Sequence, residues 1–162
     1  MTLLEVLLTT ALLATIVTAV SIVLRSSYAA WQAQEGDSIR LQSLHASLRH
    51  LVREIRQASE VTAITAASNS AGSISLLMHD GATHVWARDA GTNEIRFGVG
   101  SADHLLGEEI TALRFTGYAA DGVTATTDVD AIHAIRCTAT TVLPRDTGGE
   151  RTVSCWAWIR AS

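Results

Sequence analysis

The sequence contains no lysine, and its other absences also narrow the kind of protein it encodes. All twelve basic residues are arginines, and with sixteen acidic residues they leave a net charge of −4, without the basic surplus typical of nucleic-acid binding. Two cysteines alone are too few for a structural zinc site. The chain has no nucleophile elbow, phosphate-binding loop or dinucleotide-binding glycine motif. We therefore expect a non-catalytic protein with no cofactor and no nucleic-acid partner.

Charge is missing from a long stretch near the N-terminus. The 19 residues from Val6 to Leu24 are apolar apart from Thr and Ser. This length is close to the roughly 20 residues with which a helix crosses a bilayer core. A secretory signal peptide would instead carry a basic region before a shorter apolar run. The stretch therefore predicts a transmembrane helix over residues 1–24.

An amphipathic pattern continues from residue 25 to residue 58 without a proline. Its apolar members recur at steps of three and four, which is typical of a helix with one buried face. They are Leu41, Leu44, Leu48, Leu51, Ile55 and Ala58. Glu54 and the arginines beside it fall largely off this stripe. The pattern predicts one helix of about 85–90 Å, with a candidate kink at residues 36–38.

After residue 58, short segments rich in β-branched and aromatic residues alternate with turn residues. They predict strands over residues 61–66, 73–79, 83–88, 94–99, 110–118, 131–142 and 152–160. Turns at 79–82 and 89–92 each contain a Gly that is expected to supply a positive φ. Because no helix separates the strands, the sheet is expected to be mainly antiparallel. The predicted fold is α+β, with the long helix (1–24 and 25–58) packed on a β-rich domain (59–162).

Cys137 and Cys155 lie about equally far from the centre of the last predicted loop. In a hairpin that turns near Asp146 they would face each other. A disulfide that closes this loop would stabilise the fold by about 3 kcal/mol. It would also indicate a domain outside the cytoplasm. Two free buried thiols are the alternative.

Other conspicuous side chains have ordinary structural interpretations. Trp156 and Trp158 share one face of the last strand, and we expect this face to pack under the helix, with a subunit contact as the alternative. Trp31 lies just past the apolar segment, as is typical of a membrane-surface anchor. The six histidines lack metal-binding spacings and are expected to be solvated. The Asp residues between 121 and 130 lack EF-hand spacing and predict an ordinary acidic loop.

Glu5 is the only charged residue before Arg25. A charge at the centre of a membrane helix costs a few kcal/mol, but near the helix start the dipole favours an anion. Two interpretations follow from the residues alone. Glu5 is either a capping or surface acid, or a carboxylate placed to pair with an amine.

The N-terminus Met1-Thr2-Leu3-Leu4-Glu5-Val6, with the apolar run after it, closely resembles the mature N-terminus of type IV pilins and type II secretion pseudopilins. The segment SLRHLVREIRQA and the β segments SISLLMHDGATHVWARDAGTNEIRFGVG and EEITALRFTGYAADG resemble J-type minor pseudopilins and W-type minor pilins. Family members usually begin with Phe, so Met1 is a departure. The resemblance implies that Met1 is the processed and N-methylated residue and that Glu5 docks subunits in the filament.

The resemblance also implies a function and a location. The chain is expected to be a structural minor pilin or pseudopilin, in the bacterial inner membrane with a periplasmic domain and then in a filament. Its implied partners are other pilin or pseudopilin subunits, the inner-membrane assembly platform, the prepilin peptidase and membrane lipid. The positive-inside rule would put Arg25 in the cytoplasm, whereas the family puts it outside. There are two alternatives: a major pilin, and a non-polymerising single-pass membrane protein with a periplasmic binding domain.

Overall fold

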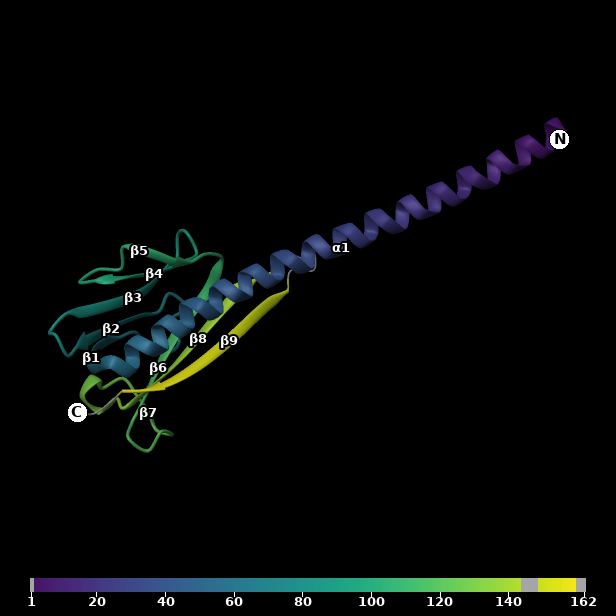
Figure 1. Ribbon diagram of the computed structural model, residues 1–162. Helices are drawn as coiled ribbons and strands as arrows, with labels where there is room; N and C mark the ends of the chain where they lie inside the picture. Colours follow the sequence, from purple (N-terminus) through teal and green to yellow (C-terminus); the bar gives the residue numbers. More distant parts are fainter. Residues whose placement is uncertain (1, 144–148, 160–162) are drawn as a thin grey trace.

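The structure, a computed structural model, describes residues 2–143 and 149–159 of the chain. One long helix precedes a β-rich domain (Figure 1). The elements are α1 (Leu3–Gln57), β1 (Ala58–Ile64), β2 (Ser73–Met78), β3 (Thr83–Asp89), β4 (Glu94–Val99), β5 (His104–Gly107), β6 (Ile110–Tyr118), β7 (Ala125–Thr126), the 3₁₀ helix η1 (Val129–Ala131), β8 (Ala134–Val142) and β9 (Glu150–Trp158). This order confirms the predicted α+β fold, with the helix packed on antiparallel strands.

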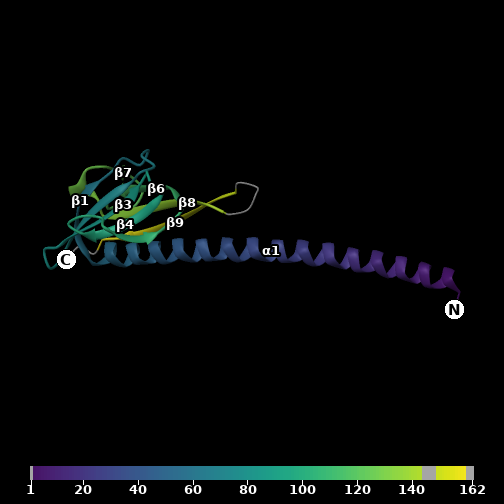
Figure 2. The same ribbon diagram turned by 90° about the horizontal axis from the view of Figure 1, so that it is seen from above.

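Helix α1 runs unbroken for 55 residues, or about 80 Å. It continues through Gly36, where the sequence allows a kink. It ends at Gln57 because Ala58 is extended, and the Ala58 N–H donates to the carbonyl of Glu54 to close the last turn. Figure 2 shows the first half of α1 projecting away from the domain and the second half lying along it. Only the second half can therefore be held by this domain.

The strands form two antiparallel sheets rather than the single sheet expected from the sequence. One has the order β1-β2-β3-β4-β5 and the other the order β7-β6-β8-β9. They meet where Gly72 donates its N–H to the carbonyl of Leu113 at 2.8 Å, while the Leu113 N–H donates to the carbonyl of Ser70. A Cβ on Gly72 would lie 2.5 Å from that Leu113 oxygen. Glycine therefore permits the backbone contact that joins the sheets.

The second half of α1 forms one side of the core. As the stripe predicts, its buried apolar side chains are Leu44, Leu48, Leu51 and Ile55, and none is more than 4% exposed. They belong to one cluster with Trp86 and Phe115 from the two sheets. Fully burying such side chains contributes about 1.5–3 kcal/mol each, so burial holds the helix on the domain. Glu54, which the pattern places largely off the stripe, is also buried.

Some predicted turns and strands differ from the structure. Gly81 has the expected positive φ of 84°, but in the next turn Asn93 (φ 58°) takes this conformation instead of Gly91. Asn tolerates the left-handed region because its short polar side chain bonds locally. The strand predicted from residue 131 begins at Ala134, after η1. The short strands β5 and β7 were not predicted, because they are too short to show a clear alternation.

Candidate assembly and membrane-spanning surface

The first half of α1 is an apolar surface without a partner in the described part of the chain. Every side chain from residue 3 to residue 32 is exposed. Thirteen of these are large aliphatic side chains between Leu3 and Leu24, each at least 45% exposed. Of the described residues, those of α1 form a helix long and apolar enough to cross a membrane, which agrees with the predicted transmembrane segment.

The Thr and Ser hydroxyls between residues 9 and 26 are satisfied within the helix. Six Thr and Ser hydroxyls donate to carbonyls three or four residues earlier, at 2.7–3.0 Å; they belong to Thr9, Thr10, Thr15, Thr18, Ser21 and Ser26. Such back-bonding uses each hydroxyl proton without water. The segment can therefore enter an apolar environment without leaving these donors unsatisfied.

Glu5 lies in a capping box at the start of α1. Its carboxylate Oε2 accepts from the Thr2 N–H at 3.1 Å, while the Glu5 N–H donates to Thr2 Oγ1 at 3.4 Å. This arrangement corresponds to the capping interpretation of Glu5. An ionised carboxylate has about four acceptor positions, so the capping bond leaves capacity for a second donor. The docking role of Glu5 stays a prediction, and Met1 lies outside the described residues.

Cys137 and Cys155 are direct cross-strand partners in β8 and β9, as the predicted hairpin requires. Both are free thiols. The Leu143 N–H donates to the carbonyl of Gly149, so these two residues form a hydrogen-bonded pair. Such pairs recur at every second position of an antiparallel ladder, and Cys137 with Cys155 is therefore also a hydrogen-bonded pair of backbones. The Cβ atoms of such a pair are about 5.5 Å apart, against about 3.8 Å in a disulfide. A bond would therefore require the strands to shift locally, and it stays a prediction.

The two thiols differ in their acidity. The hydrogen bond to Cys155, together with burial, raises the pKa of the Cys137 thiol well above its usual range. The same hydrogen bond, donated by Cys137, lowers the pKa of Cys155. Cys137 is fully buried, whereas Cys155 is half-buried and borders a groove beside α1. Cys155 is therefore the reactive thiol of the pair.

A buried polar cluster that the sequence did not predict fixes α1 on the first sheet. Glu54 Oε2 lies 2.8 Å from Nδ1 of His84 in β3. A carboxylate only accepts, so this imidazole nitrogen carries the proton. Glu54 Oε1 is 3.4 Å from Arg53 Nη2 and 3.9 Å from His50 Nε2. The expectation that the histidines are solvated is wrong for these two, whose side chains are only 28% (His50) and 18% (His84) exposed.

Aromatic rings surround this cluster. The ring centroids of Trp86 and Phe97 are 4.3 Å apart, and His84 packs edge-on against Phe97 with a centroid distance of 5.4 Å. His50 also packs edge-on against Phe97, at 5.0 Å. Trp86 and Phe97 thus place His84 in largely apolar surroundings, where its hydrogen bond to Glu54 is electrostatically stronger than in water. In the sequence, Glu54 stands out only as a carboxylate beside the apolar stripe of the helix. No local pattern pairs it with His84, because the two residues are 30 positions apart.

The tryptophans of the last strand do not pack under the helix as expected. Trp156 and Trp158 are 42% and 52% exposed, on the face of β9 opposite that of the half-buried Cys155 and the buried Ala157. Trp156 stacks on Tyr118 with ring centroids 4.4 Å apart. This geometry agrees with the alternative of a contact surface. Trp31 is 68% exposed, as a membrane-surface anchor would be in the free subunit.

The acidic loop between residues 121 and 130 is held by hydrogen bonds among its own residues. Asp121 accepts from the backbone N–H groups of Val123 and Thr124 and from the Thr124 hydroxyl. These bonds lower the pKa of the Asp121 carboxyl, and the bond from the Thr124 hydroxyl has the largest effect. Asp128 accepts from the N–H of Asp130 at the start of η1. Within residues 2–143 and 149–159, no group of three or more His, Cys, Asp or Glu residues is arranged to hold a metal ion.

Comparison of the sequence with protein-family models finds no match, and comparison with curated proteins finds no relative.

Proposed function

We propose that this chain is a structural subunit, a minor pilin or pseudopilin of a type IV pilus or type II secretion pseudopilus. In this proposal α1 anchors the subunit in the bacterial inner membrane with the β domain in the periplasm. The subunit then enters a filament through the same helix, with other pilin or pseudopilin subunits around it. The assembly platform and the prepilin peptidase are its proposed membrane partners, and it catalyses no reaction.

The exposed apolar half of α1 carries this proposal. Fully burying a large aliphatic side chain contributes about 1.5–3 kcal/mol, and because these thirteen are already partly covered by their own helix, burying the rest contributes on the order of 10–25 kcal/mol. This is as large as the roughly 5–15 kcal/mol by which a typical domain is stable. The segment therefore needs an apolar environment, and its own domain provides none among the described residues. Lipid and a bundle of like helices both provide one.

The resemblance of the N-terminus to pilins supports the choice of a filament over lipid alone. An N-terminal amine of a neighbouring subunit can reach the unused acceptor positions of Glu5 in a helix bundle. A buried ion pair adds little net stability, but a bundle in the wrong axial register would leave the carboxylate unpaired. Glu5 would in this way set the register of the subunits.

One observation favours a second candidate function. A groove between α1 and β9, described below, is large enough to take a ligand segment. It supports a non-polymerising membrane protein with a periplasmic binding domain. Filament incorporation separates the two candidates.

Substitution of Glu5 tests the proposal. In cells that assemble the filament, Glu5→Ala and Glu5→Val are expected to insert into the membrane normally but to be missing from the sheared filament fraction. Both substitutions also remove the capping bond. Thr2→Ala is the matched control, since it removes the Oγ1 acceptor of the cap and keeps the carboxylate.

The outcomes are distinct. If Thr2→Ala enters filaments and both Glu5 variants do not, the carboxylate acts in docking. Equal loss in all three variants would reduce Glu5 to a helix cap. Normal incorporation of both Glu5 variants would refute the docking role.

A further inference from the structure

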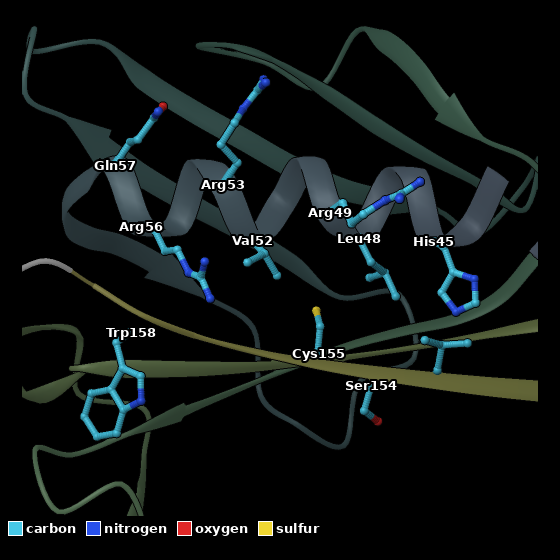
Figure 3. Close-up of a pocket in the computed structure, with 11 residues that line it drawn as sticks. His45, Leu48, Arg49, Val52, Arg53, Arg56, Gln57, Ser154, Cys155 and Trp158 are labelled. Carbon is cyan, nitrogen blue, oxygen red and sulfur yellow. The ribbon is translucent and has the colours of Figure 1, made fainter. Parts of the chain in front are cut away.

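An open groove separates the second half of α1 from strand β9. Its volume is about 880 Å³. Figure 3 shows Leu48 and Val52 reaching into it from the helix, with the Cys155 sulfur pointing up from β9. Apolar side chains of α1 therefore form one wall of the groove, and strand β9 forms the other.

Strand β9 is an edge strand of its sheet. In the hydrogen-bonded register of Cys137 with Cys155, odd-numbered residues of β9 direct their backbone groups to β8. Even-numbered residues such as Thr152, Ser154 and Trp156 therefore direct N–H and C=O away from the sheet. No backbone partner of these groups is present in residues 2–143 and 149–159. Ser154 also lines the groove, so part of this free edge borders it.

The edge lacks the features with which proteins usually prevent strand addition. Natural edge strands carry charges, prolines or bulges, or are very short. The charged residues of β9, Glu150 and Arg151, lie at its start, while residues 152–158 contain no charge and no proline, and their register with β8 is continuous. An uncharged stretch of this length at an edge is either covered by a partner or prone to aggregation.

The rim of the groove is positively charged. Arg49, Arg53 and Arg56 line it from successive turns of α1, and no Asp or Glu is among the lining residues. Arg53 pairs with Glu54, whereas the structure gives neither Arg49 nor Arg56 an acidic partner among the described residues. Unpaired arginines beside an open groove favour a carboxylate-bearing partner.

We propose that the groove binds an extended acidic segment of a partner protein, which adds to the free edge of β9 as a further antiparallel strand. Backbone hydrogen bonds to the even-numbered residues hold the segment, and Arg49 and Arg56 select acidic side chains at alternate positions. This interaction goes beyond assembly through the projecting first half of α1, because it uses the second half of α1 and strand β9 instead.

The register makes the proposal specific. Residues directly opposite each other in a sheet place their side chains on the same face. A ligand residue that bonds to Ser154 or Trp156 thus points its side chain to the outer face, beside Trp156. The ligand residues before and after it point their side chains into the groove, toward the arginines. The backbone amides of these residues face away from β9. Acidic residues are therefore expected at the positions whose amides make no bond to β9.

A synthetic strand tests these points. The probe is an acetylated and amidated nonapeptide that alternates Glu with Val and Thr, and the protein is the reduced full chain in lipid nanodiscs. N-methylation of the Val amides is expected to weaken binding at least tenfold, because these amides face β9. The same number of methyl groups on the Glu amides is expected to change binding less than twofold.

Matched variants of the protein test the charges. Arg49→Glu with Arg56→Glu is expected to weaken binding at least tenfold in about 0.1 M salt. Arg114→Glu with Arg136→Glu makes the same charge change on the exposed face of the same sheet, and is expected to leave binding within twofold. Bound peptide should also slow alkylation of Cys155 at least fivefold, since its sulfur lies in the groove.

Three results would overturn the proposal. Equal binding of the two N-methylated peptides would exclude strand addition at β9, and unchanged binding to the Arg49 and Arg56 variant would exclude the charge selection. Protection of Cys155 that rises with protein concentration, without peptide, would place a second copy of the chain in the groove instead.

Discussion

The bond between Glu54 and His84 is predicted to hold α1 on the first sheet. The Glu54 side chain is 8% exposed and lies 2.8 Å from His84 Nδ1. His84→Phe removes this donor while keeping an aromatic ring against Phe97. The substitution therefore leaves a buried carboxylate with only the weaker contacts to Arg53 and His50.

The expected cost follows from this burial. Leaving a buried polar group unsatisfied costs about 1–3 kcal/mol, and more for a charged group. Breaking a fully buried ion pair costs about 3–5 kcal/mol. Because both side chains retain some exposure and Glu54 keeps two distant contacts, we expect His84→Phe to lower the free energy of unfolding by about 2–3 kcal/mol. Arg53→Ala is the control, and since this arginine is 63% exposed it should cost less than about 1 kcal/mol.

A double-mutant cycle isolates the interaction. Glu54→Leu combined with His84→Phe removes the unpaired carboxylate, so the double variant should be more stable than His84→Phe alone. Unfolding of the full chain in detergent micelles can be followed by urea titration of tryptophan fluorescence, to which Trp86 contributes because it is buried beside the cluster. If the effects of the two substitutions simply added, the bond would not stabilise the fold as described.

Two further predictions concern the core and the thiols. Leu51→Ala is expected to destabilise the β domain by about 2–5 kcal/mol in the same urea titration, because Leu51 is 2% exposed; Leu12→Ala, in the projecting half, should leave that transition unchanged. Cys155 should react with iodoacetamide at lower pH than an ordinary thiol, because the hydrogen bond from Cys137 lowers its pKa, while Cys137 stays unmodified until the domain unfolds. Peptide mapping after alkylation across a pH series would contradict this if both cysteines reacted together.

The sequence predicted the parts of the fold that depend on a repeated pattern. The long helix follows from an apolar run that passes into a stripe with steps of three and four, and the buried Leu44, Leu48, Leu51 and Ile55 confirm it. Strands β4 and β6 match their predicted bounds, because alternation and flanking turn residues mark both ends. The pairing of Cys137 with Cys155 followed from the symmetry of one hairpin.

Long-range contacts could not be predicted in this way. The junction between the two sheets depends on the approach of Gly72 to Leu113, about forty residues later in the chain, and no local pattern encodes that contact. The partner of Glu54 lies 30 residues away for the same reason. The outward face of Trp156 also depends on which side of β9 meets α1, and alternation alone identifies two faces without choosing between them.

Sedimentation velocity of the purified full chain, with and without detergent, tests most directly whether the projecting half of α1 requires an apolar environment. We predict a monomer in micelles, and in detergent-free buffer only large assemblies, because thirteen exposed aliphatic side chains would otherwise contact water. A stable monodisperse monomer in detergent-free buffer would contradict both the membrane-anchored state and the helix bundle.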